Sequence, residues 1–264
     1  MKKDFENKVV IVTGAAAGIG KAIARRIASG GAKVLLVDYN EAKLNEALEG
    51  IKKDFGGSAA VFAADLTKAA QFATKIVAYA KETFGKIDIL VNCAGIYPSK
   101  MALEITEEDW DMVLDLNTKG YFFMAQAVAK SMVEDGTKGQ ILNITSTASE
   151  IARPGVVHYC SSKAAAKMMT QVLALEWSKY GIRVNALGPG LIETDTLLAT
   201  LTTEKAIKEH EEKISMCPLG RIGKPEEMAE IAAFFLSDAA DFITGQTLLA
   251  DGGYGAGRSY QSMK

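Results

Sequence analysis

Short apolar runs alternate with longer amphipathic segments along most of this 264-residue chain. The runs are apolar almost throughout, which is typical of parallel strands that helices cover on both faces. Strands that alternate with helices predict a parallel α/β fold. The pattern predicts strands at 9–13, 33–37, 59–63, 87–91, 140–145, 183–187 and 247–250. It predicts helices at 19–29, 41–55, 68–84, 107 to about 132, about 157 to 180, and 225–236.

The alternation loosens after Pro189 into a polar, helical segment from about Thr196 to Ser215. No proline-rich or Gly/Ser-rich linker divides the chain, and no period of about 20 to 50 residues repeats along it. We therefore expect one α/β domain. The insertion at about 194–216 is expected to form a lid over the substrate.

Charge and cysteine usage exclude several classes of protein. The 30 basic and 32 acidic residues are mixed along the chain and give a net charge of −2, so no basic footprint for nucleic acid or an anionic membrane is present. No apolar run approaches the ~20 residues of a membrane span, and the first run is too short for a signal peptide. Cys93, Cys160 and Cys217 form neither a disulfide framework nor a zinc motif. We expect a cytoplasmic protein that acts on small molecules.

A glycine-rich turn follows the first predicted strand. Gly14, Gly18 and Gly20 have the spacing G-x-x-x-G-x-G, directly before a predicted helix. Glycine permits the tight turn and lets a pyrophosphate approach the backbone, and the helix N-terminus offers free N–H groups to the anion. An ATPase-type loop does not fit, because Ala22 follows Lys21 where a magnesium-binding hydroxyl is needed. The turn therefore predicts a dinucleotide site.

Asp38, just after the second predicted strand, favours NAD over NADP. A carboxylate there can accept hydrogen bonds from the adenosine ribose hydroxyls and would repel a 2′-phosphate. Ala17 and Tyr39, where a basic residue would welcome that phosphate, are uncharged. Two structural alternatives stay open: Asp38 could merely start a turn or cap the following helix, and Asp65 could either contact the adenine edge or cap a helix.

Tyr159 and Lys163 are four residues apart in a predicted helix, so they share one face of it. A fixed positive charge stabilises a phenolate and lowers the pKa of the tyrosine from its ordinary value of about 10. Such a pair can transfer protons, although it also occurs on ordinary solvated helices. Ser146 follows the fifth predicted strand, upstream of the pair.

Together these motifs resemble the short-chain dehydrogenase/reductase family over nearly the whole chain. The resemblance rests on the Thr13–Gly20 turn, Asn92-Cys93-Ala94-Gly95, Ser146, Tyr159-x-x-x-Lys163 and Pro189-Gly190, in that order. It implies a single doubly wound Rossmann-type domain, with a seven-stranded parallel sheet in the order 3-2-1-4-5-6-7. It also implies an NAD(H)-dependent oxidoreductase that moves hydride between nicotinamide and a secondary alcohol or ketone. Family members are commonly homotetramers, with a dimer as the alternative.

The resemblance assigns four catalytic residues. Tyr159 exchanges a proton with the substrate oxygen, which Ser146 orients. Lys163 lowers the pKa of the tyrosine and binds the nicotinamide ribose. Asn117 kinks its helix and holds a water that links the lysine to solvent.

The resemblance also assigns cofactor contacts, in which the Ile192 backbone and the Thr194 hydroxyl hold the carboxamide. The full set is Gly14, Gly18, Ile19, Gly20, Asp38, Asp65, Leu66, Asn92, Ala94, Gly95, Tyr159, Lys163, Pro189, Gly190, Ile192 and Thr194. Two departures from the family pattern, Cys93 in the fourth-strand motif and Gly188 before Pro189, remove no reacting group.

The substrate is less determined. Glu150 and Arg153 could face the pocket and bind a polyhydroxylated compound, or Arg153 could pair with a carboxylate; a solvated surface pair is the alternative. A sugar or polyol is favoured, and a hydroxy acid, diol or hydroxysteroid stays open. The segment from 255 to 264 is either flexible or reaches a neighbouring subunit's pocket.

Three other functions are weaker. A ketoreductase of the 3-oxoacyl-carrier-protein type would be expected to show basic residues near Ala17 or Tyr39 in place of Asp38. A dinucleotide-binding protein without chemistry would not need the complete catalytic set. A hydrolase that uses Ser146 and His158 lacks a nucleophile elbow and an orienting acid.

Overall fold

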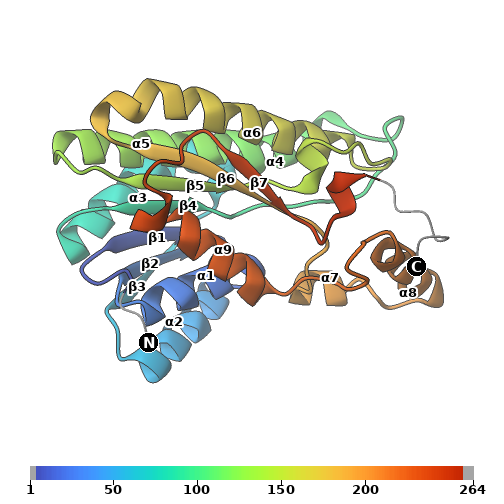
Figure 1. Cartoon of the computed structure of the whole chain (residues 1–264), viewed down its shortest axis with the longest axis horizontal. Helices are drawn as coiled ribbons and strands as arrows, with labels where there is room; N and C mark the ends of the chain where they lie inside the picture. The colour runs from blue at the N-terminus through green and yellow to red at the C-terminus, as the bar shows by residue number, and fades with distance from the viewer. Residues whose placement is uncertain (1–3, 258–264) are drawn as a thin grey trace.

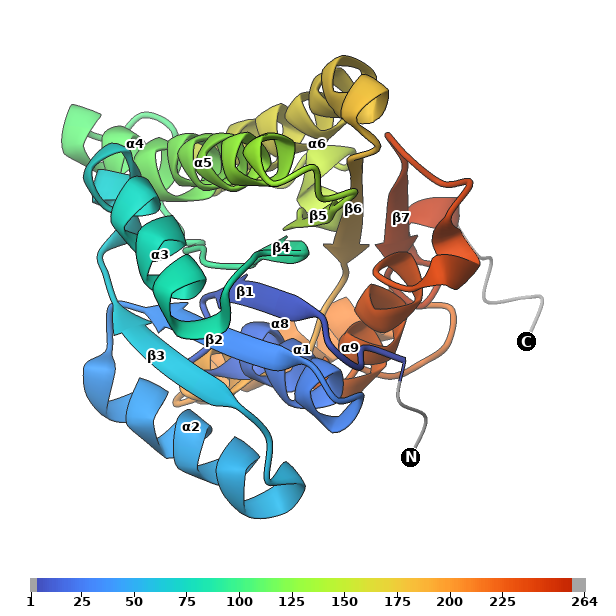
Figure 2. The ribbon, with the colours of Figure 1, turned by 90° about the vertical axis from the view of Figure 1, so that its left-hand side faces the viewer.

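Within residues 4–257, which the computed structural model describes, seven parallel strands form one twisted sheet (Figures 1 and 2). Its order is β3-β2-β1-β4-β5-β6-β7, which confirms the predicted doubly wound topology. The strands are β1 (Val9–Thr13), β2 (Lys33–Asp38), β3 (Ala59–Ala63), β4 (Ile89–Asn92), β5 (Gln140–Ile144), β6 (Arg183–Pro189) and β7 (Thr247–Ala250).

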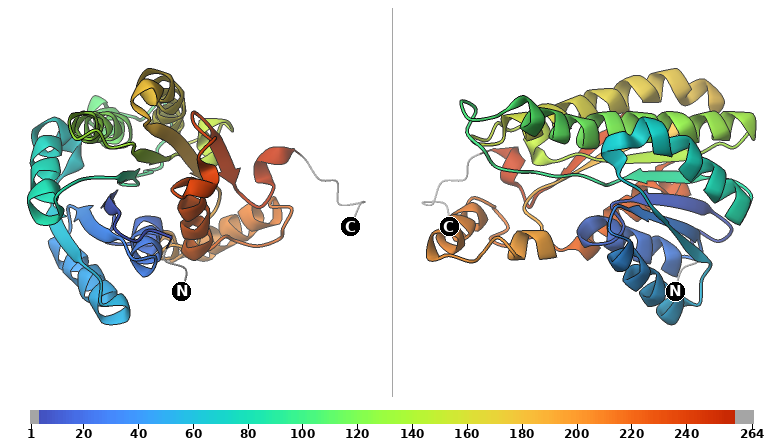
Figure 3. Two further views of the ribbon diagram at one scale, coloured as in Figure 1. Left: turned by 60° about the vertical axis from the view of Figure 1, so that its left-hand side comes forward. Right: turned by 180° about the vertical axis from the view of Figure 1, so that it is seen from behind.

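Helices cover both faces of the sheet, as Figures 2 and 3 show. One face carries α1 (Gly18–Ser29), α2 (Glu41–Phe55) and α9 (Pro225–Phe235). The other carries α3 (Ala69–Phe84), α4 (Glu107–Leu114), α5 (Tyr121–Glu134) and α6 (Val157–Trp177). Two further helices, α7 (Asp195–Leu198) and α8 (Glu204–Ser215), lie beyond the carboxyl ends of the strands (Figure 1). No helix of residues 4–257 is long and apolar enough to cross a membrane.

The two-sided cover explains why the strands are apolar throughout. Successive side chains of a strand point to opposite faces. In β1, Val10 and Val12 pack into the core beneath α1, α2 and α9, whereas Ile11 packs into the core beneath α3, α5 and α6. All three side chains are fully buried, so a polar residue at any of these positions would be left in a core.

Local signals set several helix boundaries. Asn40 begins α2, because its side chain accepts a hydrogen bond from the backbone N–H of Lys43 at 3.1 Å. Gly56 and Gly85 end α2 and α3 in the left-handed conformation, with φ of 61° and 92°. These caps stand at the ends that the sequence predicts.

The helix expected from 107 to about 132 is not continuous. α4 ends at Leu114, a π-helical segment spans Asp115–Gly120, and α5 begins at Tyr121. A π turn holds one residue more than an α turn, yet apolar residues continue on both sides of it, so helical spacing did not reveal the interruption. The predicted helix end at 180 is also wrong, because the last three residues form a separate 3₁₀ turn, Ser178–Tyr180.

Candidate active site

The glycine turn is fastened to the neighbouring strand by one side chain. Thr13 Oγ1 accepts hydrogen bonds from the backbone N–H groups of Cys93 at 3.0 Å and Ala94 at 3.2 Å, and donates to the Val91 carbonyl at 3.3 Å. Gly14 then turns with φ +67°, and a Cβ at this position would lie 2.8 Å from Ala94 Cα. A larger residue at position 14 would therefore push the ends of β1 and β4 apart.

The start of α1 suits a bound pyrophosphate. Its N-cap, Ala17, makes no side-chain capping bond, and no acidic residue stands in the first turn. The N–H groups of Gly18, Ile19 and Gly20 are therefore free to face an anion. A Cβ on Gly20 would overlap the Gly14 carbonyl oxygen, so this close approach requires glycine. These residues fit a dinucleotide.

Asp38 ends β2 beside this turn. Its Oδ2 accepts from the Ala16 N–H at 3.3 Å and its Oδ1 from the Asn40 N–H at 3.1 Å. The cap of α2 is Asn40, so the helix-cap alternative for Asp38 is wrong, whereas the bond from the N–H two residues later is that of a turn that Asp38 starts. Asp65 does act as a cap, because it accepts from the Thr67 N–H at 3.0 Å at the start of the 3₁₀ turn Leu66–Lys68.

Ser146 and Tyr159 lie together at the carboxyl edge of β5. Ser146 is buried, and its Oγ accepts from the Ala148 N–H at 3.2 Å. A hydrogen bond from Ser146 and the charge of Arg153 both lower the pKa of Tyr159, but burial has the larger effect and raises it. The prediction that a neighbouring lysine gives this tyrosine a lowered pKa is therefore wrong for this structure.

Lys163 is buried and bonded elsewhere. Its Nζ donates to the Ile144 carbonyl at 2.8 Å and to Tyr121 Oη at 3.3 Å. The ammonium lies 4.9 Å from the ring centroid of Tyr121 and 5.8 Å from that of Tyr159. Burial lowers the pKa of Lys163 to about 8, so most molecules carry the charge at neutral pH.

Tyr121 is a contact that sequence analysis missed. It stands at the start of α5 in an apolar stretch and is 2% exposed, so its pattern is that of an ordinary core aromatic. Its hydroxyl accepts from Lys163 and donates to the Ile144 carbonyl at 3.1 Å. The one signal was a phenol hydroxyl in a predicted core, since a buried tyrosine needs a hydrogen-bond partner.

Asn117 lies in the π-helical segment and is fully buried. Its Oδ1 accepts from the Ile96 N–H at 3.0 Å, and its Nδ2 donates to the Ile96 carbonyl at 2.9 Å and to Ser162 Oγ at 3.1 Å. A Cβ on Gly95 would lie 3.1 Å from Asn117 Oδ1 and 3.5 Å from Lys163 Nζ. The amide thus joins the segment after β4 to α6 close to the lysine, while the expected water stays a prediction.

Asn92, the first residue of the fourth-strand motif, has structural contacts. Asn92 is buried, and its Nδ2 donates to the Tyr121 carbonyl at 3.1 Å and to Asn143 Oδ1 at 3.0 Å. It therefore ties β4 to β5 and to the start of α5. Because Tyr121 also accepts a hydrogen bond from Lys163, these contacts connect Asn92 to the lysine.

The segment after β6 returns to the glycine turn. β6 extends through Pro189, and Gly190 donates to the Ala250 carbonyl at 3.0 Å. Ile192 pairs with Gly223 in an isolated bridge. Thr194 caps α7, since its Oγ1 accepts from the Leu197 N–H at 3.3 Å. Its methyl carbon lies 3.3 Å from where a Cβ on Gly18 would stand, so the segment after β6 packs directly against the glycine turn.

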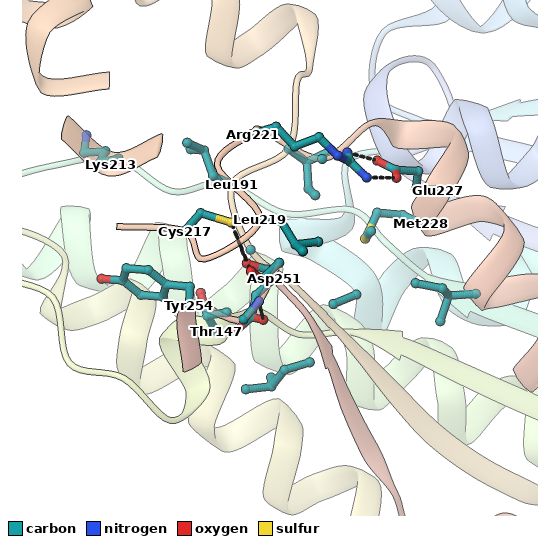
Figure 4. A pocket seen from close by; sticks show the side chains of 18 of the residues that line it. Thr147, Leu191, Lys213, Cys217, Leu219, Arg221, Glu227, Met228, Asp251 and Tyr254 are labelled. Carbon is teal, nitrogen blue, oxygen red and sulfur yellow. Dashed lines mark hydrogen bonds and ion pairs between the residues drawn. The ribbon is translucent and has the colours of Figure 1, made fainter. Parts of the chain in front are cut away.

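A cavity of about 360 Å³ opens beside these residues (Figure 4). Residues from the ends of β5, β6 and β7, from α8 and from the loop before α9 line it, among them Thr147, Leu191, Lys213, Cys217 and Tyr254.

The two charged residues of the segment before α6, Glu150 and Arg153, have different surroundings. Arg153 lines the cavity, whereas Glu150 pairs with Lys167 of α6 at 2.9 Å. Arg153 therefore faces the cavity, whereas Glu150 forms an ion pair and does not line it.

His158 does not form a pair with Ser146. It is fully buried, and neither ring nitrogen has a hydrogen-bond partner within residues 4–257. A general base would need such a bond to the nucleophile. Of the segment 255–264, expected either to be flexible or to reach a neighbouring subunit's pocket, the first two residues belong to the 3₁₀ turn Tyr254–Ala256, and residues 258–264 lie outside the described residues.

Comparison with known proteins gives a consistent result. A family model described as enoyl-(acyl carrier protein) reductase matches residues 14–255. An NAD-dependent glycerol dehydrogenase of Listeria innocua is 43% identical over 96% of this chain and 96% of its own length. Glucose 1-dehydrogenase 2 of Bacillus subtilis is 39% identical, again over 96% of both chains.

A solved structure agrees with these relatives. The crystal structure of a short-chain type dehydrogenase/reductase from Mycobacterium marinum has a TM-score of 0.89 and 33% identity, and the match covers 96% of this chain and 97% of that one. With the sheet order, the glycine turn and the Ser146, Tyr159 and Lys163 cluster in place, the chain belongs to the short-chain dehydrogenase/reductase family of oxidoreductases.

Proposed function

We propose that this protein is an NAD(H)-dependent dehydrogenase that interconverts a secondary alcohol and a ketone on a small polyhydroxylated compound, a sugar or polyol. The observation that carries the proposal is the placement of Ser146, Tyr159 and Lys163 around the carboxyl edge of β5, next to the glycine turn. The relatives named for glycerol and glucose support this substrate class.

A bound nicotinamide dinucleotide would supply the hydride acceptor for oxidation and the hydride donor for reduction. The Tyr159 oxygen takes the proton of the substrate hydroxyl in the oxidative direction and returns it in the other. Ser146 Oγ donates to the substrate oxygen and aligns it with the phenol. Lys163 binds ribose hydroxyls and keeps a positive charge 5.8 Å from the tyrosine ring centroid. Asn117 holds the segments around the lysine in place.

The dinucleotide would lie along the residues named for it above, with Asp38 selecting NAD. Both carboxylate oxygens of Asp38 are held by backbone N–H groups of Ala16 and Asn40, so the negative charge is fixed where a 2′-phosphate would approach. Tyr39 next to it is 79% exposed and uncharged. These features favour NAD over NADP and disfavour the 3-oxoacyl-carrier-protein ketoreductase.

Two further parts of the proposal concern the lid and assembly. The insertion at 194–216 is proposed as a substrate lid on the single domain, supported by α8, in which no residue is buried. A homotetramer is supported by Met168, Val172 and Leu175, which are exposed on one side of α6 by 60%, 43% and 80%. We propose a cytoplasmic location.

The experiment is a spectrophotometric assay of reduced nicotinamide, with NAD and then NADP, against sugars, polyols, diols and hydroxy acids, and with matching ketones in reverse. We expect turnover with NAD and a polyhydroxylated substrate. Turnover with NADP alone would contradict the cofactor assignment. The absence of turnover with every one of these compounds, under both cofactors, would overturn the proposed function.

A further inference from the structure

Two cations face the cavity without a carboxylate partner. Arg153 enters from the segment before α6 and Lys213 from α8, and within residues 4–257 neither makes an ion pair or a side-chain hydrogen bond. Nearby cations are different: Arg221 binds Glu227 and Lys167 binds Glu150. A guanidinium that lines a cavity with no partner is available to a ligand.

The acidic side chains of the same lining are already used. Glu227 receives two bonds from Arg221, at 2.6 and 2.9 Å, and one from the Lys224 N–H at 2.8 Å; Figure 4 shows the ion pair at the cavity wall. Asp251 accepts from the N–H groups of Gly253 at 2.9 Å and Gly255 at 2.7 Å. Arg221 and Glu227 offset each other, and the remaining charges of the lining are the cations Arg153 and Lys213 and the carboxylate of Asp251, whose oxygens are held by backbone N–H groups, so the lining keeps a net positive charge.

Of the two cations, Arg153 lies on the side of the proposed chemistry. Arg153 lowers the pKa of both Tyr159 and Tyr97 through its charge, and the two tyrosine rings are 6.0 Å apart, edge to face. Thr147, which directly follows Ser146, also lines the cavity. Ser146 and Tyr159 are not among the lining residues, so Thr147 and Arg153 connect the cavity with the proposed chemistry.

We propose that Arg153 and Lys213 form a carboxylate subsite, so that the preferred substrate is a sugar acid whose hydroxyl reacts at Tyr159 while its carboxylate binds this pair. The inference rests on the proposed function and deepens it from polyhydroxylated compounds in general to acidic ones. The planar guanidinium can hold a carboxylate through two parallel hydrogen bonds, whereas the lysine acts as a point charge. The cavity volume of about 360 Å³ falls in the range of small-molecule sites.

Steady-state kinetics on matched pairs test the subsite. Each aldonate of four to six carbons, D-gluconate among them, is compared with the alditol that carries a hydroxymethyl group in place of the carboxylate. We expect the wild-type enzyme to prefer the acids in kcat/KM. Arg153→Gln should lower kcat/KM for the acids by about 10- to 100-fold, the loss of a charge-assisted pair, and lower it much less for the alditols, which lose only the effect of the Arg153 charge on Tyr159.

Three further variants define the contributions. Arg153→Lys keeps the charge but not the fork and should recover part of the loss. Lys213→Met should lower kcat/KM for the acids by about 3- to 10-fold, because it removes one exposed charge. Lys205→Met is the control on the same helix, since Lys205 is 3.9 Å from Glu209 and does not line the cavity, and it should change neither class.

Added salt gives an independent readout. Screening should lower kcat/KM for the acids and leave the alditols nearly unchanged. Alditols turned over as well as or better than acids, or an Arg153→Gln variant that loses both classes equally, would overturn the subsite while leaving the dehydrogenase function intact. Absence of turnover with every acid and alditol under either cofactor would remove the function itself and the subsite with it.

Discussion

The first helix and the eighth are both part of the proposed active site, yet they are built in opposite ways. α1 buries Ile23 and Ile27 completely and begins at a turn in which Gly14 and Gly18 have positive φ. α8 buries no residue. The nucleotide half is therefore defined by backbone geometry that packing holds in place, and the substrate half by side chains that can change at little cost to the fold. Specificity can vary in such a molecule while cofactor binding stays constant.

The strongest test of this division removes the reacting group between the two halves. Tyr159→Phe should lower kcat by about 10²- to 10⁴-fold, the usual contribution of a positioned acid or base, because the ring stays and only the oxygen goes. NADH affinity, measured by fluorescence titration, should stay close to that of the wild type. Tyr97→Phe is the control, since it removes the hydroxyl of a ring whose centroid lies 6.0 Å from that of Tyr159; a similar loss in that variant would show that the effect does not belong to the Tyr159 oxygen in particular.

The contrast in burial predicts a contrast in stability. Ile23→Ala should reduce the free energy of unfolding by about 2–5 kcal/mol, because it leaves a cavity in the core beneath α1. Ile207→Ala on α8, where the side chain is 43% exposed, should cost less than about 1 kcal/mol. Urea unfolding of the two variants measures both values. Equal losses would mean that α8 is packed as firmly as α1.

Cofactor choice can be separated from helix capping in the same loop. Asp38→Ala should weaken NADH binding by about 10- to 100-fold, since hydrogen bonds to a charged group are lost, and should narrow the difference between NADH and NADPH. Asn40→Ala removes the cap of α2 and should cost about 1 kcal/mol of stability without altering that ratio. An unchanged preference in the first variant, with paired titrations of both nucleotides, would contradict the role given to Asp38.

The smallest expected effect is at Tyr121. The pKa of Lys163 is lowered from 10.5 to about 8 in the folded protein, so between these values the unfolded chain binds more protons and the free energy of unfolding rises with pH. Tyr121→Phe removes one acceptor from the ammonium, so the pKa of Lys163 should fall below about 8 and the rise should begin at a lower pH. The loss in stability at neutral pH should be about 1 kcal/mol. Urea unfolding across pH measures both; an unmoved onset would show that the hydroxyl does not support the charge.

Local patterns and short spacings predicted much of the molecule. The alternation of apolar runs with amphipathic segments predicted the strands and helices. Asn40, Gly56 and Gly85 stand where helices begin or end. The glycine turn was predictable because φ and close approach restrict the residue type wherever the fold occurs. The proximity of Ser146 and Tyr159 was predicted only from the resemblance to the family, because contacts between distant segments leave no local signature in the sequence.

What escaped prediction depends on three-dimensional packing. The pKa of Tyr159 is dominated by desolvation, which a spacing of four residues does not encode. The hydrogen bond between Lys163 and Tyr121 joins α6 to α5 on one face of the sheet. The divergence of Glu150 and Arg153 followed from a single partner, Lys167, since the carboxylate that finds a cation on α6 leaves the guanidinium free for the cavity.

The π-helical segment at Asp115–Gly120 fixes the orientation of α5 through its wide turn. A π turn holds one residue more than an α turn, and an α-helix advances about 100° per residue, so rewinding the same residues as regular α-helix would rotate α5 relative to α4 by roughly that angle. Asn117 would swing away from Ile96, and Tyr121 away from the lysine. Deleting one residue at the same time would cancel the rotation, so the extra residue and the wide turn that accommodates it can only be kept or lost together.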